Sequence, residues 1–201
     1  MKTIITEITA FTAVELRELH PDGFETARAD YQNSLEDAGY FDDTLTECVF
    51  PVALANMGLT SLTYAPLRYS LSSCQGDGVS FDDFDPTEQS IKELGLELPA
   101  GLDASDFIVR RDRDYIGNHY THENTFDAEY NGDYIDDIDE KEKHAAAWDF
   151  AKDLTDALRS VCLKLERAGY DFIWTGISAD NFIENAEANE WLFDEEGNIV
   201  A

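Results

Sequence analysis

Positive charge is scarce in this sequence. Only 14 Lys and Arg accompany 43 Asp and Glu among 201 residues, which gives a formal net charge of −29 and a pI near 4.1. A surface of this kind repels nucleic acid and anionic membranes, and it attracts basic surfaces over a distance. The composition therefore excludes direct binding to nucleic acid or to a membrane, and it predicts a partner with a basic surface.

Cysteine is also scarce, and long apolar runs are absent. Cys48, Cys74 and Cys162 are odd in number and far apart, which excludes a disulfide framework and a cysteine zinc cluster and is typical of a reducing compartment. No apolar run approaches the about 20 residues of a membrane-spanning helix, and the first residues lead into a strand-like segment rather than a signal peptide. We therefore expect a cytoplasmic protein.

Apolar residues are plentiful enough for a core, at 43% of the chain, with aromatic residues at 12%. These fractions argue against a disordered chain, and the length suits a single domain over residues 1–201. The patterns below predict that this domain is of the α+β class. Apolar residues at helical spacing, with capping residues and glycine or proline at the ends, predict the helices. The first follows a capping box formed by Thr12 and Glu15. The others cover 22–38, 42–57 with a kink at Pro51, 85–94 with Asp85 as N-cap, 139–168 and 178–189.

Alternating apolar and polar residues predict the strands. The stretches 67–81 and 106–131 each contain two such runs separated by a glycine-containing turn, which is the pattern of a β-hairpin. We expect the two hairpins to form one antiparallel sheet of about four strands, covered by the long C-terminal helix at 139–168 and by the N-terminal helices. Shorter strand-like segments occur at 2–10, at 171–175 and on both sides of 194–198.

The turn of the first hairpin is the most constrained stretch of the chain. It reads S-L-S-S-C-Q-G-D-G-V-S-F over residues 70–81, with a glycine on each side of Asp77. Glycine adopts the positive φ values of tight turns, so one interpretation is a turn whose polar side chains face water. The alternative is a ligand site, in which the glycines let a ligand approach the backbone beside Cys74, Gln75 and Asp77, with His122 nearby.

His119 and His122, in H-Y-T-H-E, form the other dense polar group. Residues three apart on a strand point to opposite faces, so these two share a metal ion only at a turn or bulge. Neither an H-E-x-x-H motif nor paired cysteines occur, and we expect no metal and no cofactor. A nucleophilic site of Cys74 with His122 has suitable residue types but no diagnostic spacing, and we expect a protein that is not an enzyme.

Acidic residues are concentrated in stretches that lack cations. No Lys or Arg occurs between Arg113 and Lys141, or after Arg167. Ordered carboxylates resemble the phosphates of DNA, which carry one charge per about 1.7 Å of duplex. The alternative is adaptation of the whole surface to a salty cytoplasm. The predicted binding surface comprises Asp82, Asp83, Asp85, Asp127, Glu129, Asp133, Asp136, Asp137, Asp139 and Glu140.

Four segments carry a resemblance to known proteins. They are T-A-V-E-L at 12–16, the glycine-containing turn at 70–81, H-Y-T-H-E-N-T at 119–125 and E-A-N-E-W-L-F-D-E-E-G-N at 187–198. Their order resembles that of a group of small acidic proteins carried by bacteriophages and prophages, with an S-Q-G-D-G-x-S-F motif in which Cys74 replaces the serine. The resemblance implies a phage accessory protein that interacts with its host, and it assigns no catalytic residue. In charge, the chain is similar to acidic anti-restriction proteins that mimic DNA.

The sequence therefore predicts a non-enzymatic, DNA-mimic-like inhibitor that binds the basic surface of a host defence or nucleic-acid-processing protein. A small enzyme or ligand-binding protein, with its site at the first hairpin turn and His122, is the alternative. A salt-adapted protein without a decoy role is the third interpretation.

Overall fold

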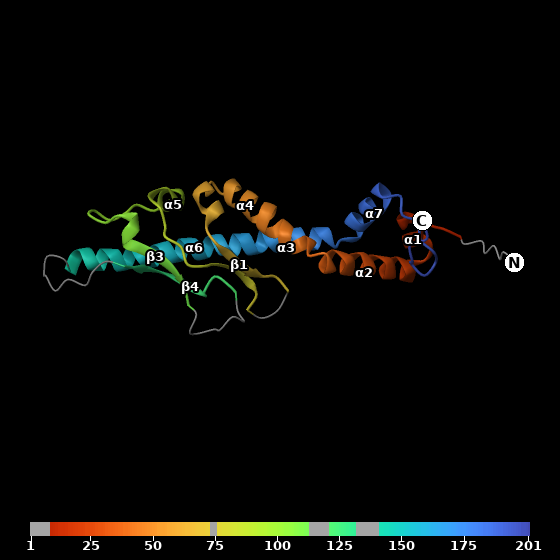
Figure 1. Ribbon diagram of the computed structural model, residues 1–201, viewed down its shortest axis with the longest axis horizontal. Coiled ribbons are helices and arrows are strands. Elements are labelled where there is room, and N and C mark those ends of the chain that lie inside the picture. Colours follow the sequence, from red (N-terminus) through yellow and green to blue (C-terminus); the bar gives the residue numbers. More distant parts are fainter. Residues whose placement is uncertain (1–8, 73–75, 113–120, 132–140) are drawn as a thin grey trace. The chain divides into compact units, whose positions relative to one another are not determined.

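The computed structural model describes residues 9–72, 76–112, 121–131 and 141–201 (Figure 1). The packing forms two compact units. Unit 1 comprises Met1–Thr44 and Asp171–Ala201, and unit 2 comprises Leu45–Tyr170. The expectation of one domain over residues 1–201 stays a prediction.

Unit 1 is built mainly from helices, of which α1 (Ala13–Leu19) is the first. Its predicted capping box is confirmed: the Glu15 N–H donates to the Thr12 hydroxyl over 3.2 Å, and the Thr12 N–H donates to the Glu15 carboxylate over 2.9 Å. The hydrogen bonds that the Thr12 N–H and the Thr12 hydroxyl donate to the Glu15 carboxylate lower the pKa of Glu15. Ser178 caps α7 (Ala179–Ala188), also as predicted. The remaining helices are α2 (Pro21–Asp37), α3 (Tyr40–Thr44) and the last residues of α6.

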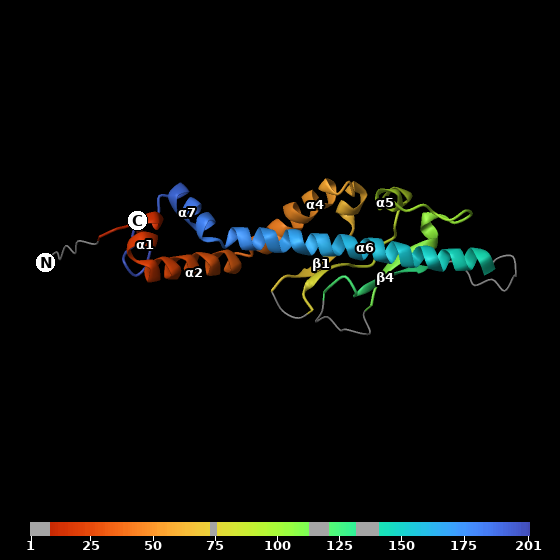
Figure 2. The same ribbon diagram turned by 180° about the vertical axis from the view of Figure 1, so that it is seen from behind.

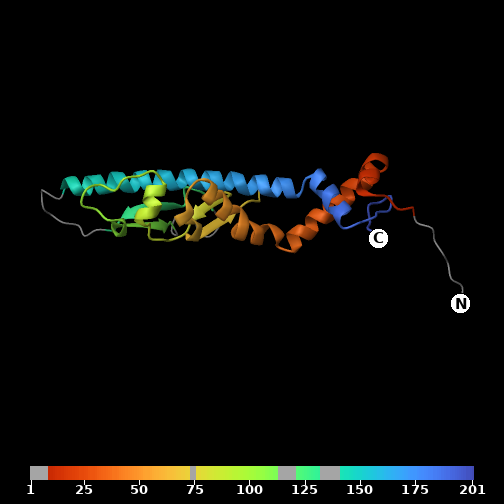
Figure 3. The same cartoon turned by 90° about the horizontal axis from the view of Figure 1, so that it is seen from above.

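The core of unit 1 is aromatic. The ring of Phe182 on α7 lies 5.4 Å from that of Phe24 on α2 and 5.8 Å from that of Phe193, measured between centroids. Figure 3 shows α7 alongside α2, the arrangement that buries these rings. Phe193 forms antiparallel bridges with Phe11 and Ile199, so the small terminal hairpin predicted around 194–198 is confirmed as isolated bridges.

The helices that begin unit 2 are interrupted where the sequence predicts a kink. A π-helix, η1 (Leu45–Val49), is followed by α4 (Phe50–Asn56). Pro51 lies in the first turn of α4, where a backbone N–H has no partner within the helix, so the missing donor costs nothing there. A 3₁₀ helix, η2 (Thr60–Tyr64), then leads to the first strand.

Helix α5 (Glu88–Glu93) begins later than predicted. Its N-cap is Thr87, which exchanges hydrogen bonds with Ser90, rather than Asp85. The prediction was wrong because Phe84 forms an antiparallel bridge with Val109, which holds the backbone extended immediately before Asp85.

The described part of unit 2 contains four strands, and they form two sheets. Strand β1 (Leu67–Ser70) pairs with β2 (Gly78–Phe81), and β3 (Phe107–Arg111) pairs with β4 (Phe126–Tyr130), both antiparallel. The two hairpins and the mixed α+β class are confirmed. The single four-stranded sheet is not found in the described residues. The strands are short, and the chain after β2 is joined to β3 by the isolated Phe84–Val109 bridge instead of by a continuous ladder of strand pairs. A short 3₁₀ helix, η3 (Ala104–Asp106), precedes β3.

Helix α6 (Lys141–Gly176) is the long C-terminal helix that the sequence predicts, and its part in unit 2 covers both hairpins (Figures 1 and 2). The predicted apolar stripe is buried, including Phe150, Leu154, Leu158, Val161 and Leu165.

The predicted end of α6 at Gly169 is wrong, and residues 171–175 are helical rather than a strand or turn. A Cβ at Gly169 would lie 2.5 Å from Leu71 Cδ1 and 3.3 Å from Phe50 Cε1. Glycine at this position therefore serves close packing, and the helix continues through it.

Among the described residues, no helix combines the length and apolar character needed to cross a membrane. The strand predicted at 2–10 lies outside the described residues, apart from Thr9 and Ala10, which form no regular element.

Candidate functional site

The side chain of Asp77 closes the loop of the first hairpin. Its carboxylate accepts hydrogen bonds from the Ser70 hydroxyl over 2.6 Å, the Ser72 N–H over 2.7 Å and the Tyr170 hydroxyl of α6 over 3.3 Å. The interpretation in which Asp77 faces water is therefore wrong, because this carboxylate ties the loop to β1 and to α6. Cys74 and Gln75, at the predicted tip, lie outside the described residues.

The two glycines beside Asp77 bring the two hairpins into contact. Gly76 has φ 92° and Gly78 has φ 152°. The Thr121 N–H donates to the Gly76 carbonyl over 3.1 Å, and a Cβ at Gly78 would lie 3.0 Å from His122 Cα. The structure thus places His122 beside this loop, which is the proximity that the ligand-site hypothesis requires.

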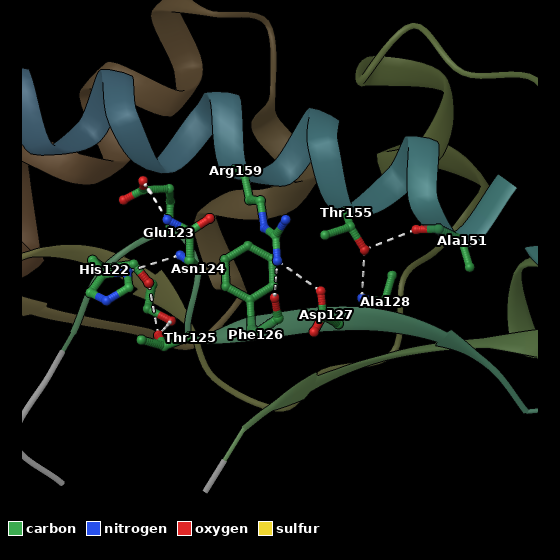
Figure 4. A network of polar contacts seen from close by, with 11 residues as sticks. His122, Glu123, Asn124, Thr125, Phe126, Asp127, Ala128, Ala151, Thr155 and Arg159 are labelled. Atoms are coloured by element: carbon green, nitrogen blue, oxygen red, sulfur yellow. Dashed lines mark hydrogen bonds and ion pairs between the residues drawn. The ribbon is translucent and has the colours of Figure 1, made fainter. Parts of the chain in front are cut away.

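His122 lies in a turn that precedes β4, where the sequence predicted a strand starting at His119. In this turn the Asn124 N–H donates to His122 Nδ1 over 3.1 Å, and the Thr125 hydroxyl lies 2.8 Å from both the His122 carbonyl and the Ser80 hydroxyl (Figure 4). The turn satisfies its polar groups locally, and β4 begins only at Phe126. His119 lies outside the described residues.

Glu166 of α6 brings another carboxylate to this region. Burial raises the pKa of Glu166, and the negative charges of Glu123 and Asp77 raise it further, while His122 opposes them. Within the part of the chain that the structure describes, no three His, Cys, Asp or Glu side chains are arranged to hold a metal ion.

Two free cysteines lie within the described residues: Cys48 is exposed, whereas Cys162 is buried. Burial raises the pKa of the Cys162 thiol to about 12, so this core residue stays protonated and unreactive at neutral pH. The hypothesis of a nucleophilic site concerns Cys74, outside the described residues, and is left untested.

Two residues of the predicted acidic surface lie on β4, and both pair with arginine. Asp127 accepts from Arg159 of α6 over 2.8 Å, and Arg159 also donates to the Phe126 carbonyl over 3.4 Å (Figure 4). Glu129 lies 3.3 Å from Arg110 of the neighbouring strand. These carboxylates therefore attach β4 to α6 and to β3.

Asp82 and Asp83, which follow β2, also form hydrogen bonds or ion pairs. Asp82 pairs with Arg68 over 2.6 Å. Burial alone would raise the pKa of Asp82, but the hydrogen bonds from Arg68 and from the Asp83 N–H lower it overall. Asp83 accepts from the Arg111 N–H over 2.8 Å, while Asp85 is exposed. The other predicted members, Asp133, Asp136, Asp137, Asp139 and Glu140, lie outside the described residues.

The negative charge is divided unevenly between the units. Unit 1 has eighteen Asp and Glu against three Lys and Arg, a formal charge of −15 over 75 residues. Unit 2 has twenty-five against eleven, a formal charge of −14 over 126 residues. Both arginines of unit 1 already form ion pairs, Arg17 with Asp180 and Arg28 with Glu25. Most carboxylates of unit 1 therefore have no Lys or Arg of their own unit to pair with.

Unit 1 also contains a pocket of about 350 Å³ that the sequence did not predict. It lies between α2, α7 and the C-terminal segment, with Phe182, Tyr31 and Trp191 in its wall. Tyr31 lies in the helix predicted at 22–38, and Trp191 lies in a strand-like segment beside 194–198, and neither pattern indicated a pocket. Their meeting depends on how α2 packs, which no local pattern reveals.

Comparison of the chain with protein-family models, curated proteins and solved structures found no match.

Proposed function

We propose that the protein is a non-enzymatic, acidic inhibitor that binds the basic, DNA-binding surface of a host defence or nucleic-acid-processing protein. The observation that supports this proposal most directly is the surplus of negative charge on unit 1. Its eighteen acidic residues include exposed carboxylates on α1, α2 and α7, such as Glu18, Asp22, Glu184 and Glu187. A surface that is charged far beyond what its own cations balance is suited to a partner of opposite charge.

The acidic residues of unit 2 differ from those of unit 1 in their pairing with arginine. In unit 2, Asp127, Glu129 and Asp82 form ion pairs with arginines of neighbouring elements, so part of the acidity holds the fold together. In unit 1, Arg17 and Arg28 each pair with one carboxylate, and the fifteen acidic residues in excess of its Lys and Arg cost stability through mutual repulsion. A basic partner would offset that repulsion, which makes unit 1 the stronger candidate for the interface.

Adaptation to salt is the competing explanation, and it predicts a different behaviour. If the charge serves only a salty cytoplasm, the isolated protein unfolds in dilute buffer and requires molar salt, because screening then offsets the repulsion. Similar midpoints of cooperative unfolding at low and physiological salt would exclude that explanation.

The proposal is tested by capturing partners from host lysate and measuring the affinity of the purified pair by calorimetry. We expect capture of proteins that bind DNA, competition by duplex DNA, and an affinity that falls steeply as salt rises. An affinity that changes neither with salt nor with added duplex would overturn the proposal.

A further inference from the structure

The pocket of unit 1 has a composition that suits one kind of ligand. Its wall includes the aromatic side chains of Phe182, Tyr31 and Trp191, and Asp30 and Asn198 also line it. Its volume of about 350 Å³ lies near the lower end of ligand pockets, which span roughly 300–1,000 Å³. The pocket therefore fits a single long side chain better than a large cofactor.

The aromatic rings provide faces that attract a cation. Tyr31 lies 6.1 Å from Trp191 and 5.5 Å from Phe182, measured between ring centroids, and the planes of Tyr31 and Trp191 are inclined by 65°. Burial raises the pKa of Tyr31, although the hydrogen bond from Asn181 lowers it in part, so the ring stays neutral at physiological pH. A cation over the face of such a ring is attracted by the negative charge of the ring's π system.

The segment that carries Asn198 is held firmly against α2. The Asp194 carboxylate accepts from the Asn198 N–H over 2.8 Å and from the Asn198 amide over 2.9 Å. Gly197 has φ 93°, and a Cβ there would lie 3.0 Å from the Ala27 nitrogen of α2, so backbone packs directly on backbone. A pocket whose wall is already fixed loses little entropy when a ligand enters.

We propose that this pocket receives an arginine side chain of the basic partner. The inference rests on the proposed function, since it names the anchor by which unit 1 holds that partner. Arginine fits better than lysine because its planar, weakly hydrated guanidinium stacks on aromatic rings while its N–H groups donate to a carboxylate such as that of Asp30. An apolar side chain would gain nothing from the formal charge of −15 on the unit.

The pocket is tested first without any partner. In a Trp148→Phe, Trp174→Phe background, Trp191 is the only tryptophan, and its fluorescence reports binding of N-acetyl-arginine amide. The matched probes are N-acetyl-citrulline amide, which has nearly the same shape without the charge, and N-acetyl-leucine amide. We expect saturable binding of the arginine probe and at least about tenfold weaker binding of the other two. Equal binding of arginine and citrulline, or tighter binding of leucine, would overturn the inference.

Two variants connect the response to the pocket. Asp30→Asn should weaken binding of the arginine probe several-fold while leaving unfolding unchanged, because Asp30 is exposed. Tyr31→Leu should weaken it further, and NMR shifts of residues in the wall give a readout that does not depend on tryptophan. Glu36→Gln on the same helix, outside the pocket lining, is the control and should bind as the parent does. If Asp30→Asn and Tyr31→Leu both bind as the parent does, the proposed site is wrong.

With a captured partner, this inference and the proposed function fail in different ways. If Trp191→Leu binds the partner as tightly as wild type while duplex DNA still competes, the pocket is not the anchor and the proposed function stands. If the arginine probe binds but duplex DNA displaces the protein from no captured partner, the pocket holds a cation and the proposed function fails. We expect Trp191→Leu to weaken partner binding about tenfold, whereas Trp174→Phe, at an exposed position outside the lining, changes nothing.

Discussion

The two units use their carboxylates differently. In unit 2, Asp77 ties a hairpin loop to α6, and Asp127 joins β4 to α6 through Arg159. In unit 1, Asp194 accepts hydrogen bonds that order the C-terminal segment. The acidic residues of that unit nevertheless outnumber its Lys and Arg by fifteen. Acidic residues within one chain therefore have two roles, and net charge alone does not separate them.

A binding surface is therefore expected where the acidic residues outnumber those that stabilise the fold. Removing a paired carboxylate leaves an arginine without its partner and weakens the fold, whereas removing a surplus carboxylate relieves repulsion. Stability and binding should consequently respond in opposite ways to substitutions in the two units.

The largest expected effect is on binding. Reversal of three charges in unit 1, Glu18→Lys with Glu184→Lys and Glu187→Lys, should weaken binding of the captured partner about 100-fold, or by about 2.7 kcal/mol. The same reversals on the exposed face of α6, at Asp149, Asp153 and Asp156, change net charge equally and should cost less than about tenfold.

Affinities from calorimetry at two salt concentrations decide this test. Equal losses in the two triple variants would mean that net charge alone drives binding. A larger loss on reversing Asp133, Asp136 and Asp137 would place the interface in that stretch instead.

The next effect is on the stability of unit 2. Gly78→Ala should destabilise it by about 1–3 kcal/mol, because the new Cβ meets His122 and the backbone φ of 152° is strained for alanine. Gly101→Ala is the control, since Gly101 has φ 80° but open space around its Cβ position, and it should cost about 1 kcal/mol. Urea unfolding measures both, and equal costs would show that the contact with His122 is unimportant.

Asp77→Asn tests the loop anchor and should cost about 1 kcal/mol, because one carboxylate oxygen that accepts hydrogen bonds becomes an amide donor facing the donors of Ser72 and Tyr170. Tyr170→Phe removes the 3.3 Å hydrogen bond from the Tyr170 hydroxyl to Asp77 and should cost less. Thermal unfolding that matches wild type in Asp77→Asn would restore the interpretation of a simple solvent-facing turn.

A smaller effect is expected from Asp194→Asn in unit 1. Hydrogen bonds from the Asn198 side chain and from backbone N–H groups lower the pKa of Asp194, so its stabilising contribution is present above about pH 4 and is lost as the pH falls through the folded-state pKa. The variant should therefore melt slightly lower at pH 7, and the difference should vanish in strong acid. A difference that is the same at pH 2 and pH 7 would contradict this.

The smallest effect has the opposite sign and belongs to unit 2. Because the pKa of Glu166 is raised, its charged form opposes folding above that pKa, and the penalty disappears below the unfolded-state value of about 4.3. Glu166→Gln should thus raise the free energy of unfolding at pH 7 by about 0.5 kcal/mol or less, and with it the melting temperature, and should be silent at pH 4. A lower melting temperature at pH 7 would show that Glu166 makes a stabilising contact.

Local chemistry in the sequence determined much of this fold. The capping box at Thr12, the cap at Ser178 and the apolar stripe of α6 each depend on residues within a few positions of one another, so their patterns were readable directly. The two hairpins followed from alternation and from glycine in the first turn. The charge surplus was likewise fixed by composition.

The tertiary structure decided what each of these residues does. The sequence pattern predicts a helix end at Gly169, yet this residue lies inside α6, where the side chains of Leu71 and Phe50 pack against it and leave no room for a Cβ. Asp77 reads as a turn residue, yet Tyr170, distant in the sequence, donates to it. The pocket beside Tyr31 and Trp191 exists only because α2 and the C-terminal segment pack together. Packing joins residues that no local pattern relates, since a side chain's neighbours depend on the whole path of the chain and not on its spacing in the sequence.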